Sequence, residues 1–327
     1  VSGCTFIVKP AELTPSSAIH LFKLIEEAGT PAGVANLILG KGSVIGDALT
    51  SDPRVDLVSF TGSLSVGQRI MSLASKTIKK VALELGGKNP NIIFADANLD
   101  AAIDNAVTAG FLHSGQVCSA GTRLIVEKSI HDQVVNEIVR RAKAIKLGGP
   151  ESTDAETGPL ISESHLKKVE EYVAKGIAEG AKLLVGGSRL TDGDFAKGNF
   201  FPPTLLDDCN TKMSCVQDES FGPIITVETF ENEDEAIQLA NDTIYGLSGA
   251  VWSGDTEKAR RVSRALRHGT VWVNDYGPYK PEAEWGGFKA SGIGRELGEH
   301  GLQEFLESKH IWTNNKPGRS GWFKDPR

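Results

Sequence analysis

Hydrophobic positions in the first hundred residues alternate between short apolar runs and longer stretches in which apolar residues recur every three or four positions. The short runs are typical of strands, and the longer periodicity is typical of helices. The predicted strands are 5–8, 34–39, 57–60 and 81–85, and the predicted helices are 16–28, 44–50 and 66–74. Because strands that alternate with helices form βαβ units, this part is predicted to build a parallel sheet.

The alternation resumes after Gly86 and predicts a second α/β region. Its predicted helices are 99–112, 130–146, 162–179, 234–241 and 256–266, and its predicted strands are 122–126, 182–185, 224–230, 247–252 and 270–274. Residues 186–203 are predicted to be a surface loop. The tail at 308–314 is predicted to be a strand that pairs with a sheet edge, in another subunit.

Composition excludes several classes of function. The 327-residue chain has a formal net charge of -7, which offers no basic field for nucleic acid. Its apolar runs are too short to cross a bilayer. The four cysteines lack paired spacing, which predicts a reducing, cytoplasmic compartment and no metal site. The chain begins without methionine, in a predicted strand, so we expect it to be the interior of a longer protein.

Two strand-to-helix turns are candidate phosphate sites. One spans residues 40–46 (GKGSVIG) and the other spans 60–67 (FTGSLSVG). Each places glycine where a strand ends and a helix begins, so that backbone N–H groups and the helix dipole can face a phosphate. Many such turns bind nothing, and the first misses the GxGxxG spacing by one residue, so the pattern alone does not choose between them.

Cys118 and Glu84 are the candidate catalytic residues. Cys118 lies in HSGQVCSAG at 113–121, and Glu84 lies in LELGGK at 83–88. A thiolate attacks carbonyl carbon, and a carboxylate activates either the thiol or a later water. The alternatives are a structural role for Cys118 as a small buried hydrophobe and a Cys118–His113 pair in a cysteine hydrolase. The five-residue offset of His113 does not favour one helical face.

Four motifs carry a resemblance that covers essentially the whole chain. They are VALELGGK at 81–88, GQVC at 115–118, ESFGP at 219–223 and GGFK at 286–289. In order and spacing they resemble the aldehyde dehydrogenase superfamily. Trp285 before Gly286, GIGRELG at 292–298 and Tyr279 look most like the branch that oxidises betaine aldehyde.

The resemblance implies that Cys118 forms a thiohemiacetal with the aldehyde, that hydride passes to a nicotinamide, and that Glu84 activates the water that hydrolyses the resulting thioester. For the cofactor it implies NAD. A carboxylate beside the adenosine ribose disfavours a 2′-phosphate, although NADP stays an alternative. The residues implied to bind the cofactor are Lys9, Glu12, Gly62, Ser63, Gly67, Leu85, Gly86, Glu219 and Phe221.

The resemblance also implies that Trp285 and Tyr279 line the substrate tunnel. Aromatic faces attract a quaternary ammonium through cation–π interactions. Asp275, Glu282 and Glu284 are close in sequence and would raise the local concentration of a cationic aldehyde. The expected substrate is betaine aldehyde. The alternatives are ω-amino aldehydes or semialdehydes as substrates, and a truncated, inactive chain that acts only in binding or assembly.

The implied architecture is a partial Rossmann-type nucleotide-binding domain followed by an α/β catalytic domain. The expected boundaries are 1–86 for the second half of the nucleotide-binding domain, 87–290 for the catalytic domain, and 291–327 for a return segment with an oligomerisation strand. Members of the family have a longer N-terminal part that supplies the first half of the nucleotide domain and an oxyanion-stabilising asparagine. The full-length protein is expected to be a homo-oligomer, a dimer or a tetramer.

Overall fold

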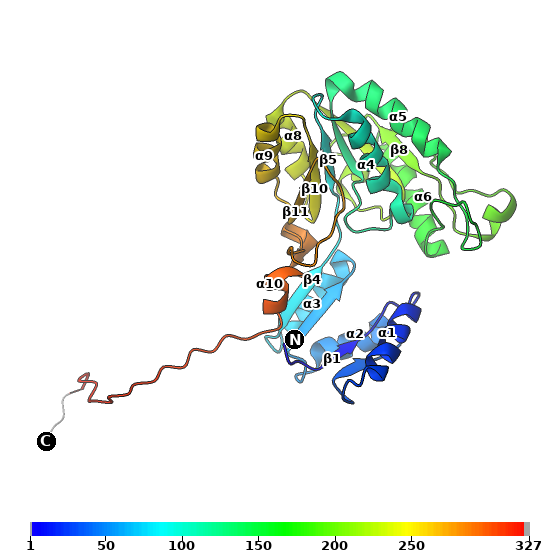
Figure 1. Ribbon diagram of the computed structural model, residues 1–327. Helices are drawn as coiled ribbons and strands as arrows, with labels where there is room; N and C mark the ends of the chain where they lie inside the picture. The colour runs from blue at the N-terminus through cyan, green and yellow to red at the C-terminus, as the bar shows by residue number, and fades with distance from the viewer. Residues whose placement is uncertain (1, 324–327) are drawn as a thin grey trace.

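The molecule is described by a computed structural model that covers residues 2–323, and its fold is α/β throughout (Figure 1). Near the amino terminus, two parallel strands form a small ladder, β1 (Phe6–Val8) and β2 (Ala35–Leu37). They are followed along the chain by α1 (Ser16–Glu27) and α2 (Gly42–Ser51). A second ladder has the order β12 (Gly292–Ile293), β4 (Lys80–Glu84), β3 (Leu57–Thr61), with α3 (Leu64–Ala74) between β3 and β4 in sequence.

A seven-stranded sheet forms the larger part of the molecule. Its strands, in spatial order, are β11 (Thr270–Val273), β10 (Ser248–Trp252), β5 (Pro90–Ile93), β6 (Arg123–Glu127), β9 (Ile224–Phe230), β8 (Thr204–Asp207) and β7 (Lys182–Val185). All neighbours are parallel except β7, which is antiparallel to β8. A mostly parallel sheet of this kind is normally covered by helices on both faces.

Alternate residues of the central strands enter two different cores. Ile93 and Leu124 pack with α4 (Leu99–Phe111) and α5 (His131–Ala144). Ile92 and Ile125 point to the other face, toward α8 (Glu233–Asn241) and α9 (Thr256–Ala265). A third core lies under α6 (Glu163–Ala178) and α7 (Ser214–Gln217). The remaining elements are α10 (Gly298–Gln303) and the short 3-10 helices η1 (Leu112–Gly115), η2 (Lys128–Ile130), η3 (Gly193–Lys197) and η4 (Lys289–Ser291).

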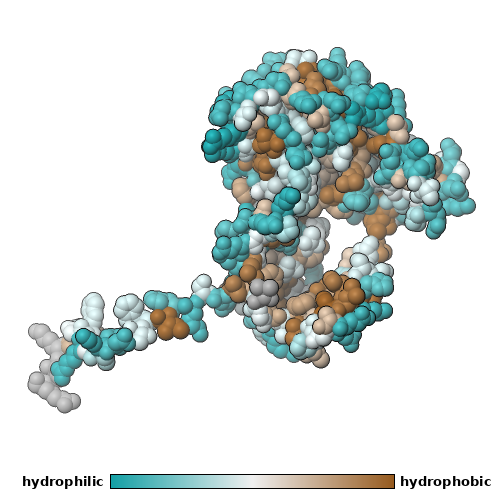
Figure 2. All heavy atoms as spheres, viewed as in Figure 1, coloured by the Kyte–Doolittle hydropathy of each residue, from teal (hydrophilic) through white to brown (hydrophobic). Residues whose placement is uncertain are grey.

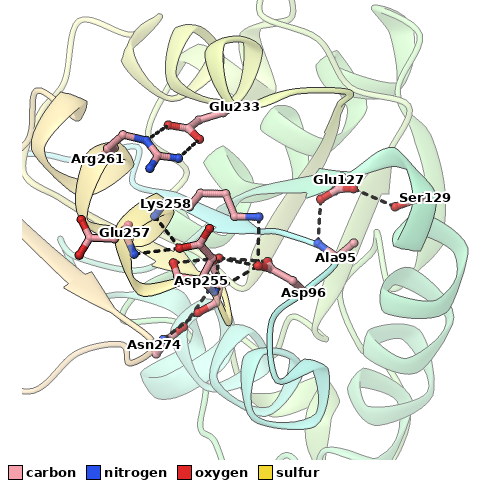
Figure 3. A network of polar contacts seen from close by, with 11 residues as sticks. Ala95, Asp96, Glu127, Ser129, Glu233, Asp255, Glu257, Lys258, Arg261 and Asn274 are labelled. Carbon is pink, nitrogen blue, oxygen red and sulfur yellow. Dashed lines mark hydrogen bonds and ion pairs between the residues drawn. The ribbon is translucent and has the colours of Figure 1, made fainter.

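The carboxyl ends of β5 and β10 are tied together by a polar network (Figure 3). Both carboxylate oxygens of Asp96 accept hydrogen bonds from Ser253 Oγ at 3.0 Å, and Lys258 Nζ lies 3.0 Å from the same group. Asp255 caps α9 by accepting from the backbone N–H groups of Glu257 and Lys258. At the next strand, Glu127 accepts from Ala95 N at 2.8 Å. These side chains are already engaged with one another, so this edge of the sheet is structural.

Most of the predicted elements are confirmed to within a few residues, but the structure adds three strands that were not predicted, β5, β8 and β12. β5 is central in the sheet, although its sequence contains Pro90 and Asn91. Pro90 is the first residue of the strand, where proline is tolerated, and Asn91 Oδ1 accepts from Trp252 Nε1 at 3.0 Å. Because Pro90 and Asn91 interrupt the apolar pattern, the sequence does not predict this buried strand.

The first part of the chain departs from the expected single sheet, because β1–β2 and β3–β4 are separate ladders. Within residues 2–323, no further strand pairs with the open edges of β1 and β3. α1 buries none of its residues, and Leu13, Leu21 and Leu24 are more than half exposed. The space-filling view shows hydrophobic side chains gathered over this part (Figure 2). The apolar surface and the open edges are those of a sheet that lacks covering elements.

The tail departs from expectation within this single chain. Residues 308–314 have no strand, and Ile311 and Trp312 are 76% and 81% exposed. The segment runs away from the body of the molecule (Figure 1). Pairing in another subunit therefore stays a prediction, and the last four residues of the expected 291–327 segment lie outside the described part of the chain. No helix within residues 2–323 has the length and apolar character needed to cross a membrane.

A buried ion pair joins β6 to β9 and provides a test of the sheet. Arg123 and Glu228 are fully buried and form two hydrogen bonds, Nε to Oε2 at 2.5 Å and Nη2 to Oε1 at 3.0 Å. We expect Arg123→Met to lower the free energy of unfolding by about 3–5 kcal/mol, because it leaves a buried carboxylate unpaired. The double variant Arg123→Met/Glu228→Leu should recover most of this loss in urea denaturation. A double variant as unstable as the single one would contradict this account.

Candidate functional site

The two larger sheets meet at the short segment 85–89, which connects β4 to β5. Every residue in this segment is buried. Ser291 fixes it from the return segment, since Leu85 N donates to Ser291 O at 2.8 Å and Ser291 Oγ donates to Gly86 O at 2.6 Å. The carboxyl end of β4, where Glu84 lies, is therefore held next to the amino end of β5.

Cys118 reaches the same junction from the other direction. After α4 the chain turns through three consecutive residues with positive φ, His113, Ser114 and Gly115. A Cβ atom on Gly115 would lie 2.1 Å from Gly222 O, so only glycine fits there. The turn brings the partly buried Cys118 to the amino end of β6, where it packs against a cluster that includes Trp272 and Trp285.

Hydrogen bonds hold the three backbone carbonyls of the loop 118–120. Asn89 Nδ2 donates to both Cys118 O and Ala120 O at 2.9 Å. Tyr276 OH donates to Ser119 O at 2.7 Å, and the hydroxyls of Ser119 and Tyr279 are 2.6 Å apart. The backbone around the sulfur is therefore fixed by side chains from the Glu84 segment and from the segment that follows β11.

Glu84 is a buried carboxyl group whose environment favours the protonated form. It is 5% exposed, and its Oε2 atom has no hydrogen-bond partner among the described residues. Burial, and then the nearby charge of Glu296, raise the pKa of Glu84 to about 7, although Trp285 and Arg295 oppose the shift. A carboxyl group with this pKa exchanges a proton near neutral pH, as a general base requires.

Cys118 and Glu84 belong to one electrostatic environment. Burial raises the pKa of the Cys118 thiol, and the charges of Glu219 and Glu84 raise it further. The backbone N–H groups of Ser119 and Cys118 act in the opposite direction and lower the pKa of the thiol. The thiol and both carboxyl groups therefore lie close enough for the charge of each carboxylate to act on the sulfur.

Glu219 lies against the same glycine segment. Its Oε1 atom accepts from Gly87 N at 3.0 Å, and a Cβ atom on Gly86 would come within 2.4 Å of Oε2. Burial raises the pKa of Glu219, while the Gly87 N–H group and Lys88 lower it. Phe221 is 38% exposed and has a positive φ, and its ring is 6.1 Å from that of His165 in an edge-to-face arrangement.

The proposed nucleotide residues follow the carboxyl ends of the parallel strands in the two small ladders. Gly62 and Ser63 follow β3, and Ser63 is the residue before α3. Gly67 lies in α3 beside Leu85, where a Cβ atom would be 2.7 Å from the Leu85 side chain. Carboxyl ends of parallel strands are the usual place for nucleotides in open α/β sheets.

Lys9 and Glu12 follow β1 and adjoin the other glycine turn. Glu12 Oε1 accepts from Gly42 N at 2.6 Å, at the start of α2, and Lys9 Nζ donates to Pro10 O at 2.6 Å. A hollow here is lined by Pro10, Ala11, Glu12, Pro15, Leu39, Gly40 and Lys41. The turn at 40–46 therefore belongs with Lys9 and Glu12, and the turn at 60–67 belongs with Leu85.

Four aromatic rings gather on one side of Cys118. The ring centroids of Tyr279 and Trp285 are 4.6 Å apart, and each lies 6.3 Å from that of Trp272. Tyr276 lies 4.8 Å from Trp272. No sequence pattern singled out Trp272 or Tyr276. An aromatic residue in a strand pattern followed by a tyrosine four positions later was the only available signal.

His113 and the acidic residues near the aromatic rings are the two other sets of candidates. His113 is exposed, and no hydrogen bond within residues 2–323 joins it to Cys118, which disfavours the Cys–His pair. Of the three acidic residues near the aromatic rings, Glu284 pairs with His300 Nδ1 at 2.9 Å, and the Asp275 side chain accepts from Tyr276 N at 2.8 Å. Both carboxylates are thus engaged locally.

Comparison with known proteins places the chain in a family. Residues 1–311 match the model of the aldehyde dehydrogenase family. The chain is 56% identical over 322 residues to a betaine aldehyde dehydrogenase of Bacillus subtilis, covering 98% of this chain and 66% of that protein. It is 42% identical over 327 residues to a chloroplastic aminoaldehyde dehydrogenase of Arabidopsis thaliana, covering 99% of this chain and 64% of that protein.

A solved structure agrees with these matches. A betaine aldehyde dehydrogenase of Staphylococcus aureus, in complex with NAD+, superposes with a TM-score of 0.96 at 53% identity, covering 99% of this chain and 64% of that one. The chain thus spans just under two thirds of the length of the relatives that it matches. On the family match and this likeness, the chain belongs to the aldehyde dehydrogenase family.

Proposed function

We propose that the chain carries the nucleophile, the base and most of the cofactor site of an NAD-dependent enzyme that oxidises betaine aldehyde to its carboxylate. The observation that carries this proposal is the contact between the two segments: Asn89, five residues after Glu84, donates to the carbonyls of Cys118 and Ala120, and the charge of Glu84 raises the pKa of the Cys118 thiol. A nucleophile and a base with a mutual influence of this kind are what acyl chemistry through a thioester requires.

The proposed reaction begins with attack of the Cys118 sulfur on the aldehyde carbon, which gives a thiohemiacetal. The thiol proton passes to solvent in this step, because burial keeps the resting thiol neutral. When bound, the nicotinamide accepts the hydride that leaves the substrate carbon. The Cys118 thioester then remains, and Glu84 takes a proton from the water that attacks it. The carboxylate product leaves and the Cys118 thiol is restored.

The chain's residues fit a dinucleotide. Gly86 has no side chain, which lets the Glu219 carboxylate approach the backbone next to Leu85. Glu219 would accept hydrogen bonds from the nicotinamide ribose, with Phe221 packed nearby, and the Gly62–Ser63–Gly67 turn would face the phosphates. Lys9 and Glu12 would hold the adenosine ribose. A carboxylate at Glu12 favours NAD over NADP.

The aromatic group supports a cationic substrate. Tyr279, Trp285 and Trp272 present π faces close to Cys118, and cation–π attraction is about 0.5–2 kcal/mol per ring. A trimethylammonium group has no N–H to donate, so rings suit it better than carboxylates. The second candidate substrate is an ω-amino aldehyde or a semialdehyde. The similarity to an aminoaldehyde dehydrogenase supports this alternative.

The remaining third of the relatives' length would complete the assembly. We propose three parts, 1–86, 87–290 and 291–327, in which the last part returns to the first. The pairing of β12 with β4, directly at Glu84, supports the boundary near 291. The open edges of β1 and β3 would receive the missing strands, and the exposed tail would pair within a homo-oligomer.

The first prediction tests the two catalytic roles in the protein expressed at full length. Cys118→Ala should abolish aldehyde oxidation, whereas Glu84→Gln should give one burst of NADH per site and then almost no turnover, because the thioester is not hydrolysed. Stopped-flow absorbance at the NADH wavelength measures both effects. Cys4→Ala, which removes an exposed thiol, is the matched control and should leave turnover unchanged. Steady turnover by Cys118→Ala would refute the proposal.

The second prediction follows from the pKa of Glu84. Because a base must be deprotonated, and this pKa is raised to about 7, the steady hydrolysis rate should rise between roughly pH 6 and pH 8 and then level off. Glu296→Gln removes a nearby negative charge, so it should move the rise to lower pH. The pH profile of kcat measures this. A profile that is flat over this range in the wild-type protein would contradict Glu84 as the base.

The third prediction tests the substrate. Trp285→Ala should raise KM for betaine aldehyde by roughly two- to thirtyfold more than KM for 3,3-dimethylbutanal, a neutral aldehyde of the same shape, since only the cation loses cation–π attraction. Trp322→Ala, which removes an exposed ring outside the predicted strand at 308–314, is the control and should change neither value. Equal losses for the two aldehydes would favour a purely steric role for Trp285.

A further inference from the structure

Asn89 is a fully engaged buried amide at the junction of the two sheets. It is 1% exposed and follows Gly86, Gly87 and Lys88 in the segment that connects β4 to β5. Its Nδ2 atom donates to Cys118 O and Ala120 O at 2.9 Å, and its Oδ1 atom accepts from Ser248 N at 3.0 Å. One side chain thus joins the Glu84 segment, the nucleophile loop and the start of β10.

Gly87 makes room for this contact. A Cβ atom on Gly87 would lie 2.7 Å from both Asn89 Oδ1 and Cys118 O, and 2.9 Å from Asn89 Nδ2. Any side chain at position 87 would therefore push the amide and the carbonyl apart. Gly87 therefore leaves the space in which Asn89 Nδ2 can donate to the carbonyl of Cys118.

The carbonyl that Asn89 holds determines where the next N–H group points. The peptide bond after Cys118 is trans, as are all described peptide bonds, so the N–H of Ser119 points opposite to Cys118 O. The Ser119 N–H group lies next to the Cys118 sulfur in the chain and lowers the pKa of the thiol. If the carbonyl were free to rotate away from Asn89, this N–H group would leave the sulfur with it.

We propose that Asn89 is a positioning residue, which orients the Cys118–Ser119 peptide so that its N–H group stabilises the thiolate of the nucleophile. The inference rests on the proposed role of Cys118, but it concerns the thiol itself and can be measured without turnover. A purely structural amide would affect the stability of the fold and leave the reactivity of the sulfur unchanged.

Asn91 provides the matched control. It lies two residues further along β5, is fully buried, and accepts from Trp252 Nε1 rather than contacting the nucleophile loop. In full-length protein without NAD, the rate of Cys118 alkylation by iodoacetamide is followed against pH by mass spectrometry of the Cys118 peptide. Asn89→Ala should raise the apparent pKa and slow alkylation at pH 8 by roughly two- to tenfold, the range that corresponds to one hydrogen bond. Asn91→Ala should leave both unchanged.

The outcomes separate the two proposals. An unchanged alkylation profile in Asn89→Ala, or the same change in Asn91→Ala, would overturn the positioning role, even if turnover falls. If the profile moves as expected but Cys118→Ala still oxidises aldehyde, the proposed function fails and the positioning of the thiol stands. Asn89→Ser, whose hydroxyl is too short to reach both carbonyls, should act in the same direction and replaces the alanine variant if that variant does not fold.

Discussion

The five residues between β4 and β5 are the constraint on which the site depends. Because they are all buried and only five long, they force the carboxyl end of one sheet against the amino end of another. Two glycines allow this approach, since side chains at Gly86 and Gly87 would collide with Glu219 and with the Cys118 carbonyl. Glu84 precedes this segment and Asn89 ends it, so the base and the support of the nucleophile loop share one short connection.

At this junction each sheet contributes a different set of the proposed site residues. The small ladders present the carboxyl ends of their strands, where the proposed nucleotide residues lie, and the seven-stranded sheet presents its amino edge, next to which Cys118 lies. The opposite edge of the large sheet is occupied by the Asp96–Ser253–Lys258 network. The proposed chemistry is thus placed where two edges meet, and the burial of Glu84 there strengthens its interaction with nearby charges.

Much of the fold and the two proposed catalytic residues could be predicted from the sequence, because the apolar periodicity is strong and the motifs are local. The helices and most strands follow from apolar spacing, and Cys118 and Glu84 stand out as residues whose chemistry suits their glycine-rich surroundings. What could not be predicted depends on contacts distant in sequence. β5 was hidden because Asn91 is satisfied by Trp252, 161 residues away. No sequence pattern singled out Asn89, and Trp272 lies in a predicted strand like any other apolar residue; only the fold brings both to the nucleophile loop.

The central claim is that Cys118 and Glu84 line one site, and electrostatics tests it most directly. The apparent pKa of the Cys118 thiol is measured by its absorbance as a thiolate, in variants that lack Cys4, with Glu84 present and with Glu84→Gln. Above pH 7 the carboxylate is charged and opposes a second negative charge nearby, so the account predicts a lower thiol pKa in the glutamine variant. An identical pKa in the two proteins would mean that the groups do not sense one another, and would contradict the account.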